Sequence, residues 1–85
     1  NNVTRERTLI LQEKKNSSAE ALKKFNLTKR ETEVLFWMTQ GKTDDVIAKL
    51  LGISIRTVHK HAENIYTKLG VETRIAATMK AVENI

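Results

Sequence analysis

The order of apolar and polar residues predicts four helices between residue 28 and the end of the chain. In the third, apolar residues recur at i, i+4, i+7 and i+11, the spacing of one buried helix face. These residues are Val58, Ala62, Ile65 and Leu69. The first helix has a face with the members Glu31, Val34, Leu35 and Met38. The last helix carries apolar residues on more than one side, which is typical of a helix with two partners. The pattern therefore predicts an all-α fold, a small four-helix bundle.

Capping residues mark the ends of these segments. Thr28 and Glu31 have the spacing of a capping box, in which hydroxyl and carboxylate satisfy each other's backbone donors at a helix start. The N-caps expected for the next three helices are Thr43, Ser54 and Thr73. Gly41 and Gly52 are expected in the left-handed conformation that ends a helix, and Gly70 is expected to stop the third helix.

The two middle helices are separated by only two or three residues around Gly52, which predicts a helix-turn-helix. Ala48 is a small residue where the two helices must approach each other. The apolar residues available to lock them together are Ile47, Leu51, Ile53 and Val58. An ordinary helical hairpin would show similar stripes. The outward face of the helix from Ser54 favours nucleic acid, because it mixes donors and acceptors that suit base edges and phosphates. That face comprises Arg56, Thr57, His59, Lys60, Glu63, Asn64, Thr67 and Lys68.

We interpret residues 1–26 as a helical linker or arm and residues 27–85 as the folded domain. The sequence Ser17-Ser18-Ala19-Glu20 can start a helix as a second capping box. Leu9, Ile10 and Leu11 are available for packing or association. The chain opens with Asn1 instead of Met, which suggests a fragment of a longer protein.

Charge and composition change this picture little. The net charge of +5 and the pI near 9.8 suit a polyanionic partner, but residues 1–41 carry eight basic and five acidic groups and residues 42–85 carry seven and five. Cysteine is absent, which excludes disulfides and thiolate metal sites. Apolar runs are too short for a membrane span or signal peptide, so a cytoplasmic location is expected.

The sequence gives little support for metal binding, catalysis or cofactor binding. His59 and His61 point about 200° apart on a helix and do not converge on one metal ion. His61 is expected to turn toward the helix-turn-helix packing as a partly buried, hydrogen-bonding residue, and His59 to face outward. Trp37 is interpreted as core packing, the alternative being a stacking platform for bases. No nucleophile motif, phosphate loop or cofactor fingerprint is found, so we expect neither an enzyme nor a cofactor.

The chain resembles the LuxR/FixJ family of bacterial regulators from Leu27 to about Ile85, and not in residues 1–26. The residues that carry the resemblance are Leu27-Thr28-Lys29-Arg30-Glu31-Thr32-Glu33-Val34-Leu35, Gly41-Lys42-Thr43, Ile47-Ala48, Leu51-Gly52-Ile53-Ser54, Arg56-Thr57-Val58, His61, Lys68-Leu69-Gly70-Val71, Arg74 and Ala77. The resemblance implies a DNA-binding domain in which residues 43–51 form a scaffold helix and residues 54–69 a recognition helix in the major groove. It also implies a final helix that often pairs such domains on DNA.

The resemblance further implies roles for single residues. Base-edge contacts are implied for His59, Lys60, Glu63 and Asn64. Contacts to the DNA backbone, or positive charges near it, are implied for Lys42, Thr43, Ser54, Arg56, Thr57, Lys68 and Arg74. Arg30 and Glu31 look like charges that tie the first helix to its neighbours. One departure is Asp44-Asp45-Val46, where the family often has Asn, a variable residue and Glu. Asp44 either repels phosphate or simply caps its helix.

We therefore expect a sequence-specific binder of double-stranded DNA, the effector domain of a bacterial transcriptional regulator. The alternative is a helical protein interaction or dimerisation module. Ile75, Met79 and Val82 have the spacing of a dimer seam, unless the bundle buries them all. We expect a weak homodimer, because two reading helices on one site raise affinity. RNA polymerase is a further candidate partner.

Overall fold

The structure, a computed structural model, describes residues 24–84 and forms this part of the chain from four helices without a strand. They are α2 (Lys29–Thr39), α3 (Asp44–Leu51), α4 (Ile55–Leu69) and α5 (Arg74–Glu83). The predicted all-α fold is confirmed. The arm predicted for residues 1–26, with its capping box at Ser17 and its apolar run at Leu9, lies almost entirely outside the described residues. Ile85 does too.

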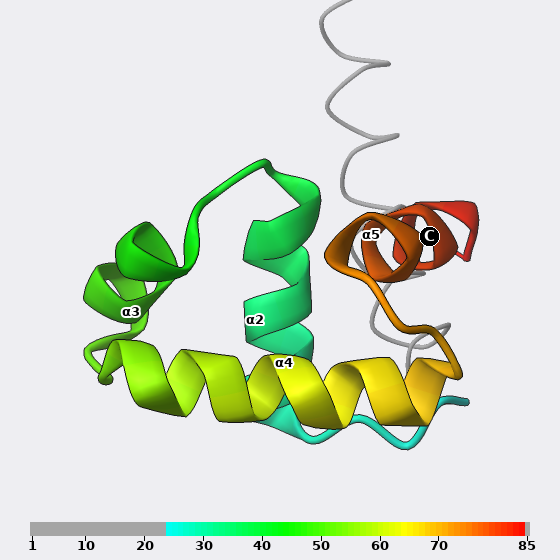
Figure 1. Cartoon of the computed structure of the whole chain (residues 1–85), viewed down its shortest axis with the longest axis horizontal. Coiled ribbons are helices and arrows are strands. Elements are labelled where there is room, and N and C mark those ends of the chain that lie inside the picture. The colour runs from blue at the N-terminus through cyan, green and yellow to red at the C-terminus, as the bar shows by residue number, and fades with distance from the viewer. Residues whose placement is uncertain (1–23, 85) are drawn as a thin grey trace, which may run out of the picture.

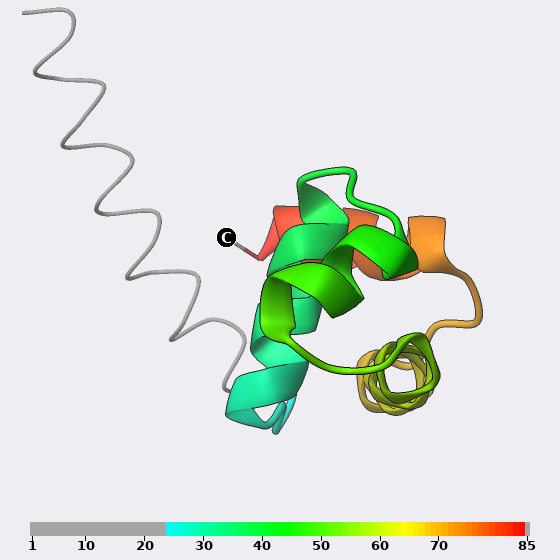
Figure 2. The same cartoon turned by 90° about the vertical axis from the view of Figure 1, so that its left-hand side faces the viewer.

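Helix α4 is the element against which the other three are arranged. It packs against α2, α3 and α5, and α2 also packs against α5. Figure 1 shows α4 running along one side of the molecule, with α3 near its start and α5 near its end. In Figure 2, α4 is seen end-on and lies to one side of the remaining helices. One face of α4 is therefore turned away from the bundle.

Each predicted N-cap is present and satisfies backbone donors that the helix itself leaves unpaired. The hydroxyl of Thr28 accepts a hydrogen bond from the amide of Glu31 at 3.1 Å, and the Glu31 carboxylate accepts one from the amide of Thr28 at 3.0 Å. The hydroxyls of the other three caps also accept from the third residue of their helices; these caps are Thr43, Ser54 and Thr73. The helix starts were thus predictable to the residue.

The turn between α3 and α4 depends on the backbone conformation of Gly52. Its φ is +68°, a backbone conformation that residues with a Cβ atom rarely adopt. Ile53 then donates its amide to the carbonyl of Ala48 at 3.0 Å, which closes the end of α3. Ala48 is buried, as the close approach of two helices requires. The predicted helix-turn-helix is confirmed.

The core consists of the faces that the apolar spacing indicated. The entire α4 stripe is buried, as are the four predicted members of the α2 face. Trp37 is half-buried against this core and lies edge-on to Phe36, with ring centroids 5.0 Å apart, so its interpretation as packing is confirmed. Helix α5 packs on α2 and α4 through Ala77 and Ala81, which gives it the two partners expected.

Candidate nucleic-acid interface

The outward face of α4 presents the side chains implied for base contacts. His59, Lys60 and Glu63 are exposed and Asn64 is half-buried. Residues one turn apart on a helix lie on the same side, so His59 and Glu63 form one row and Lys60 and Asn64 a second row beside it. The amphipathic sequence of α4 explains this placement. Because the apolar stripe on the opposite side is buried, the orientation of α4 about its own axis is fixed. The four residues therefore share one accessible surface.

The residues implied for backbone contacts divide into two groups. Five lie at or before the first turns of α3 and α4, where unpaired amide groups and the helix dipole favour anions. They are Lys42, Thr43, Ser54, Arg56 and Thr57. The Ser54 and Thr57 hydroxyls are also hydrogen-bonded to each other at 2.9 Å. The second group, Lys68 and Arg74, is held by carboxylates within the domain.

Lys68 lies against Glu31 of α2, with its Nζ 2.6 Å from the carboxylate Oε1. The Glu31 side chain is buried. Burial raises the pKa of Glu31, but hydrogen bonds from Lys68 and from Thr28, together with the charge of Lys68, outweigh burial and hold the pKa below its usual value. The implied role of Glu31 in tying the first helix to a neighbour is thus met. Arg30 pairs instead with Glu33 of its own helix at 3.7 Å, so among the described residues it makes no such link.

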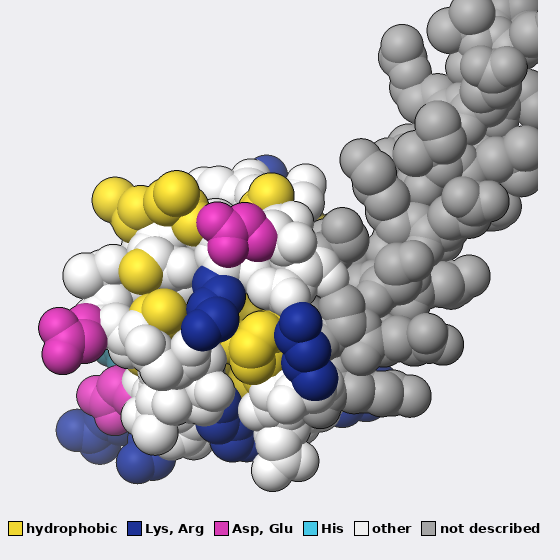
Figure 3. Space-filling model, turned by 90° about the vertical axis from the view of Figure 1, so that its right-hand side faces the viewer, with side chains coloured by type: hydrophobic (Ala, Val, Ile, Leu, Met, Phe, Trp, Pro, Cys, Tyr) yellow, Lys and Arg dark blue, Asp and Glu magenta, His cyan; other side chains and the backbone are white. Residues whose placement is uncertain are grey.

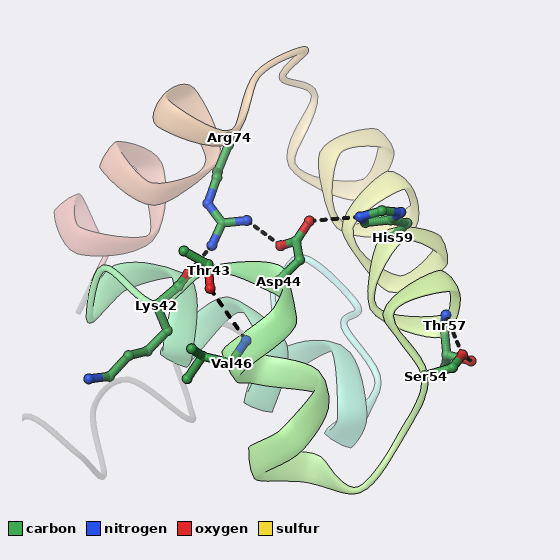
Figure 4. Close-up of polar contacts among 8 residues, drawn as sticks. All are labelled: Lys42, Thr43, Asp44, Val46, Ser54, Thr57, His59 and Arg74. Carbon is green, nitrogen blue, oxygen red and sulfur yellow. Dashed lines mark hydrogen bonds and ion pairs between the residues drawn. The ribbon is translucent and has the colours of Figure 1, made fainter.

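Asp44 joins α3, α4 and α5 at one point (Figure 4). One carboxylate oxygen accepts a hydrogen bond from Nη1 of Arg74, and the other lies 3.0 Å from Nε2 of His59. Nη2 of Arg74 also donates to the carbonyl of Lys42. The sequence left two possibilities for Asp44, repulsion of phosphate or capping of the helix. The structure adds a third, a link between helices whose negative charge is balanced by Arg74.

The sequence did not identify the partner of Glu31 or that of Asp44, although the resemblance implied an interhelical role for Glu31. The Glu31 to Lys68 contact could have been anticipated, because a carboxylate on a face otherwise made of apolar residues requires a cation. The Asp44 contacts had no such signal, since Asp44 looks like an ordinary first-turn carboxylate. Only the crossing of α3, α4 and α5 brings Arg74 and His59 to it.

His61 is half-buried, as expected. The hydrogen bond expected of its side chain is not formed by one of the two ring nitrogens. Its Nδ1 is buried and has no hydrogen-bond partner among the described residues. Residues 24–84 contain no group of three or more His, Asp or Glu side chains that could hold a metal ion. None of the helices in the same part of the chain is long and apolar enough to cross a membrane.

The outer edge of α5 carries exposed apolar side chains. Ile75, Met79 and Val82 are 72%, 58% and 56% exposed, so the alternative that the bundle buries them is wrong for the described residues. Figure 3 looks onto the side on which α5 lies and shows a group of hydrophobic side chains at the upper left of the described part. Within residues 24–84, the predicted seam is therefore exposed.

The sequence of this domain is similar to those of known proteins. The family model described as bacterial regulatory proteins, luxR family, matches residues 25–81. The transcriptional activator protein AhyR of Aeromonas hydrophila is 47% identical over 58 residues, which are 68% of this chain and 22% of the relative. The transcriptional regulatory protein LiaR of Bacillus subtilis is 40% identical over 75 residues, 88% of this chain and 36% of the relative. The nitrate/nitrite response regulator protein NarP of Escherichia coli is 45% identical over 53 residues, 62% and 25% of the two chains. The chain thus spans between 22% and 36% of the length of these relatives.

Proposed function

Because this chain belongs to the LuxR family of bacterial regulatory proteins, we propose that residues 27–85 form a domain that binds double-stranded DNA sequence-specifically as the effector part of a transcriptional regulator. Helix α4 enters the major groove in this proposal. The observation that carries it is the outward face of α4, which presents donors and acceptors in two adjacent rows while the opposite face is buried in the core. Such a face can address base edges, whereas a uniformly charged one addresses phosphates alone.

The proposal assigns the reading of bases to His59, Lys60, Glu63 and Asn64. It assigns phosphate contacts to the group around the starts of α3 and α4. Lys68 and Arg74 contribute less to DNA in this assignment than their charges suggest, because each is bonded to a carboxylate of the domain. We propose no enzymatic activity and no cofactor. A domain that binds chromosomal DNA acts in the cytoplasm, at the nucleoid.

The same proposal includes a weak homodimer through α5. Three exposed apolar side chains one helical turn apart form a narrow strip, too small for an obligate interface. Two copies bound to adjacent half-sites nevertheless gain affinity through effective concentration. RNA polymerase is proposed as a further partner, because AhyR is named a transcriptional activator.

Salt dependence separates DNA binding from the alternative, a helical module that binds another protein. Binding of the 85-residue chain to a duplex selected from a random pool is expected to weaken at least tenfold between about 50 and 300 mM salt, because phosphate contacts release counterions. Fluorescence anisotropy with a labelled duplex measures this loss. Absence of binding even at the lowest salt would refute the proposed function and leave the interaction module.

Lys60 is expected to contribute to sequence preference. Its side chain is exposed on the reading face and makes no ion pair among residues 24–84. Lys60→Ala is expected to lower the ratio of affinities for selected and random duplexes about tenfold, the usual discrimination of one base contact. Lys49→Ala is the matched control, since Lys49 is exposed on α3 and pairs with Asp45 at 3.3 Å. An equal loss on both duplexes would assign Lys60 to phosphate instead.

A further inference from the structure

The contact between His59 and Asp44 constrains where the imidazole carries its proton. The Nε2 atom of His59 lies 3.0 Å from a carboxylate oxygen of Asp44, and Figure 4 shows the ring turned with this nitrogen toward α3. An ionised carboxylate only accepts hydrogen bonds. Nε2 must therefore be the donor, whatever the charge of the ring. The second nitrogen, Nδ1, accepts a hydrogen bond in the neutral ring and donates one in the charged ring.

Arg74 keeps Asp44 in this role. Its guanidinium donates hydrogen bonds to the other carboxylate oxygen and to the carbonyl of Lys42, so it holds the carboxylate in this orientation. The Asp44 and Arg74 side chains are 26% and 34% exposed, while the His59 side chain is 58% exposed. The pair is thus partly shielded by the bundle, and the imidazole is the member that reaches the proposed DNA surface.

We propose that Asp44 is a positioning residue that makes the DNA contact of His59 depend on protonation. With Nε2 committed to Asp44, neutral His59 offers DNA only an acceptor, which suits neither a phosphate oxygen nor the O6 and N7 acceptors of guanine. Charged His59 offers a donor and a positive charge to the same groups. DNA affinity therefore increases as the pH falls from about 8 to 6, the range in which histidine ordinarily titrates.

Charged side chains face His59 from each helix packed against it. Asp44 faces it from α3, Arg74 stands behind Asp44 on α5, and the charged residues near it on α4 are Arg56, Lys60 and Glu63. Side chains of these four types ordinarily titrate outside the range from about pH 6 to 8. Tyr66 of α4 interacts electrostatically with the same charges. Burial and the charge of Asp44 raise the pKa of Tyr66, and together they outweigh the charge of Arg74, which lowers it. Tyr66 is therefore neutral here, and His61 is the one other histidine to be controlled.

The inference rests on the proposed function, and a pH series tests it. Affinity of the wild-type chain for the selected duplex is expected to increase about fivefold between pH 8 and pH 6, the effect of one linked proton. His59→Gln is expected to reduce this change to less than about twofold, whereas His61→Gln leaves it intact. Wild-type binding that is independent of pH would overturn the inference and leave DNA binding standing. No binding at any pH would remove the proposed function itself.

Asp44→Asn separates positioning from a purely structural role. An amide can donate to Nε2, which frees the neutral ring to carry its proton on Nδ1 and donate to DNA. The variant is therefore expected to bind at least about twofold more tightly than the wild type at pH 8 and to depend less on pH, since only the added charge of His59 then changes with protonation. Asp45→Asn removes a neighbouring charge that pairs with Lys49, and it should keep the wild-type pH response. A weaker Asp44→Asn protein whose pH response equals that of the wild type would overturn the inference.

A measurement without DNA gives a second, independent result. Imidazole ¹⁵N shifts of the free chain above pH 8 are expected to show the Nε2–H tautomer at His59, and a mixture of tautomers in Asp44→Asn. A predominant Nδ1–H tautomer in the wild type would contradict the positioning role, whatever the DNA affinity.

Discussion

Replacing Ile65 with alanine is expected to lower the free energy of unfolding by about 2–5 kcal/mol, the usual cost of removing a large aliphatic side chain from a packed core. Ile65 is completely buried in the middle of the α4 stripe, where α4 meets the other helices. The cavity is costly because a domain of this size has one core, and the surrounding helices are fixed by their caps. Urea denaturation followed by circular dichroism measures the change.

Ile75→Ala is the matched control for this variant. It removes the same atoms from a side chain that is 72% exposed on α5, and we expect a change within about 0.5 kcal/mol. Similar losses in the two variants would mean that α5 is covered by other parts of the chain or by a second copy. At protein concentrations that favour the proposed dimer, Ile75→Ala should instead weaken association, which sedimentation measures.

The helices and their core could be predicted from the sequence because both depend on local rules. Caps such as Ser54 act within three residues, and the left-handed glycines act at one residue, so neither needs knowledge of the tertiary structure. The buried faces followed from the helical period alone. Even the buried position of Glu31 was on the predicted face, although its partner was not identified.

The candidate interface could be predicted only in part, because charged side chains choose partners across the fold. Lys68 and Arg74 looked available for phosphate when they were considered helix by helix. In the structure, Lys68 binds a carboxylate 37 positions earlier in the chain, and Arg74 one 30 positions earlier. Such contacts depend on how the helices cross in the folded domain, and the pattern of apolar and polar residues does not predict the crossing. The outward placement of His59 and Lys60 needed no tertiary information, because the buried stripe of their own helix determines it.

Lys68→Met is expected to destabilise the domain by about 1–3 kcal/mol at pH 7, because it leaves the buried carboxylate of Glu31 without its cation. Methionine keeps much of the length of the side chain, so the change mainly removes the charge and the hydrogen bond at 2.6 Å. A lysine that served only as a phosphate contact would give the opposite result, with unchanged stability and weaker binding to all DNA sequences. Lys60→Met is the matched control on the same helix, and it should leave stability unchanged within about 0.5 kcal/mol.

The pH dependence of this destabilisation identifies Glu31 as its source. In the wild type, the pKa of Glu31 is lower in the folded than in the unfolded chain. Its contribution to stability is therefore present above the unfolded-state pKa and is lost as the pH falls through the folded-state pKa. Without Lys68, its hydrogen bond and charge no longer lower the pKa of Glu31 while burial still raises it, so the folded-state pKa is higher than in the wild type and protonation costs the folded variant less. Between pH 7 and pH 5 the deficit of Lys68→Met relative to the wild type should accordingly shrink. A deficit that stays constant in urea denaturation across this range would show that the loss comes from packing of the lysine stem and not from the unpaired carboxylate.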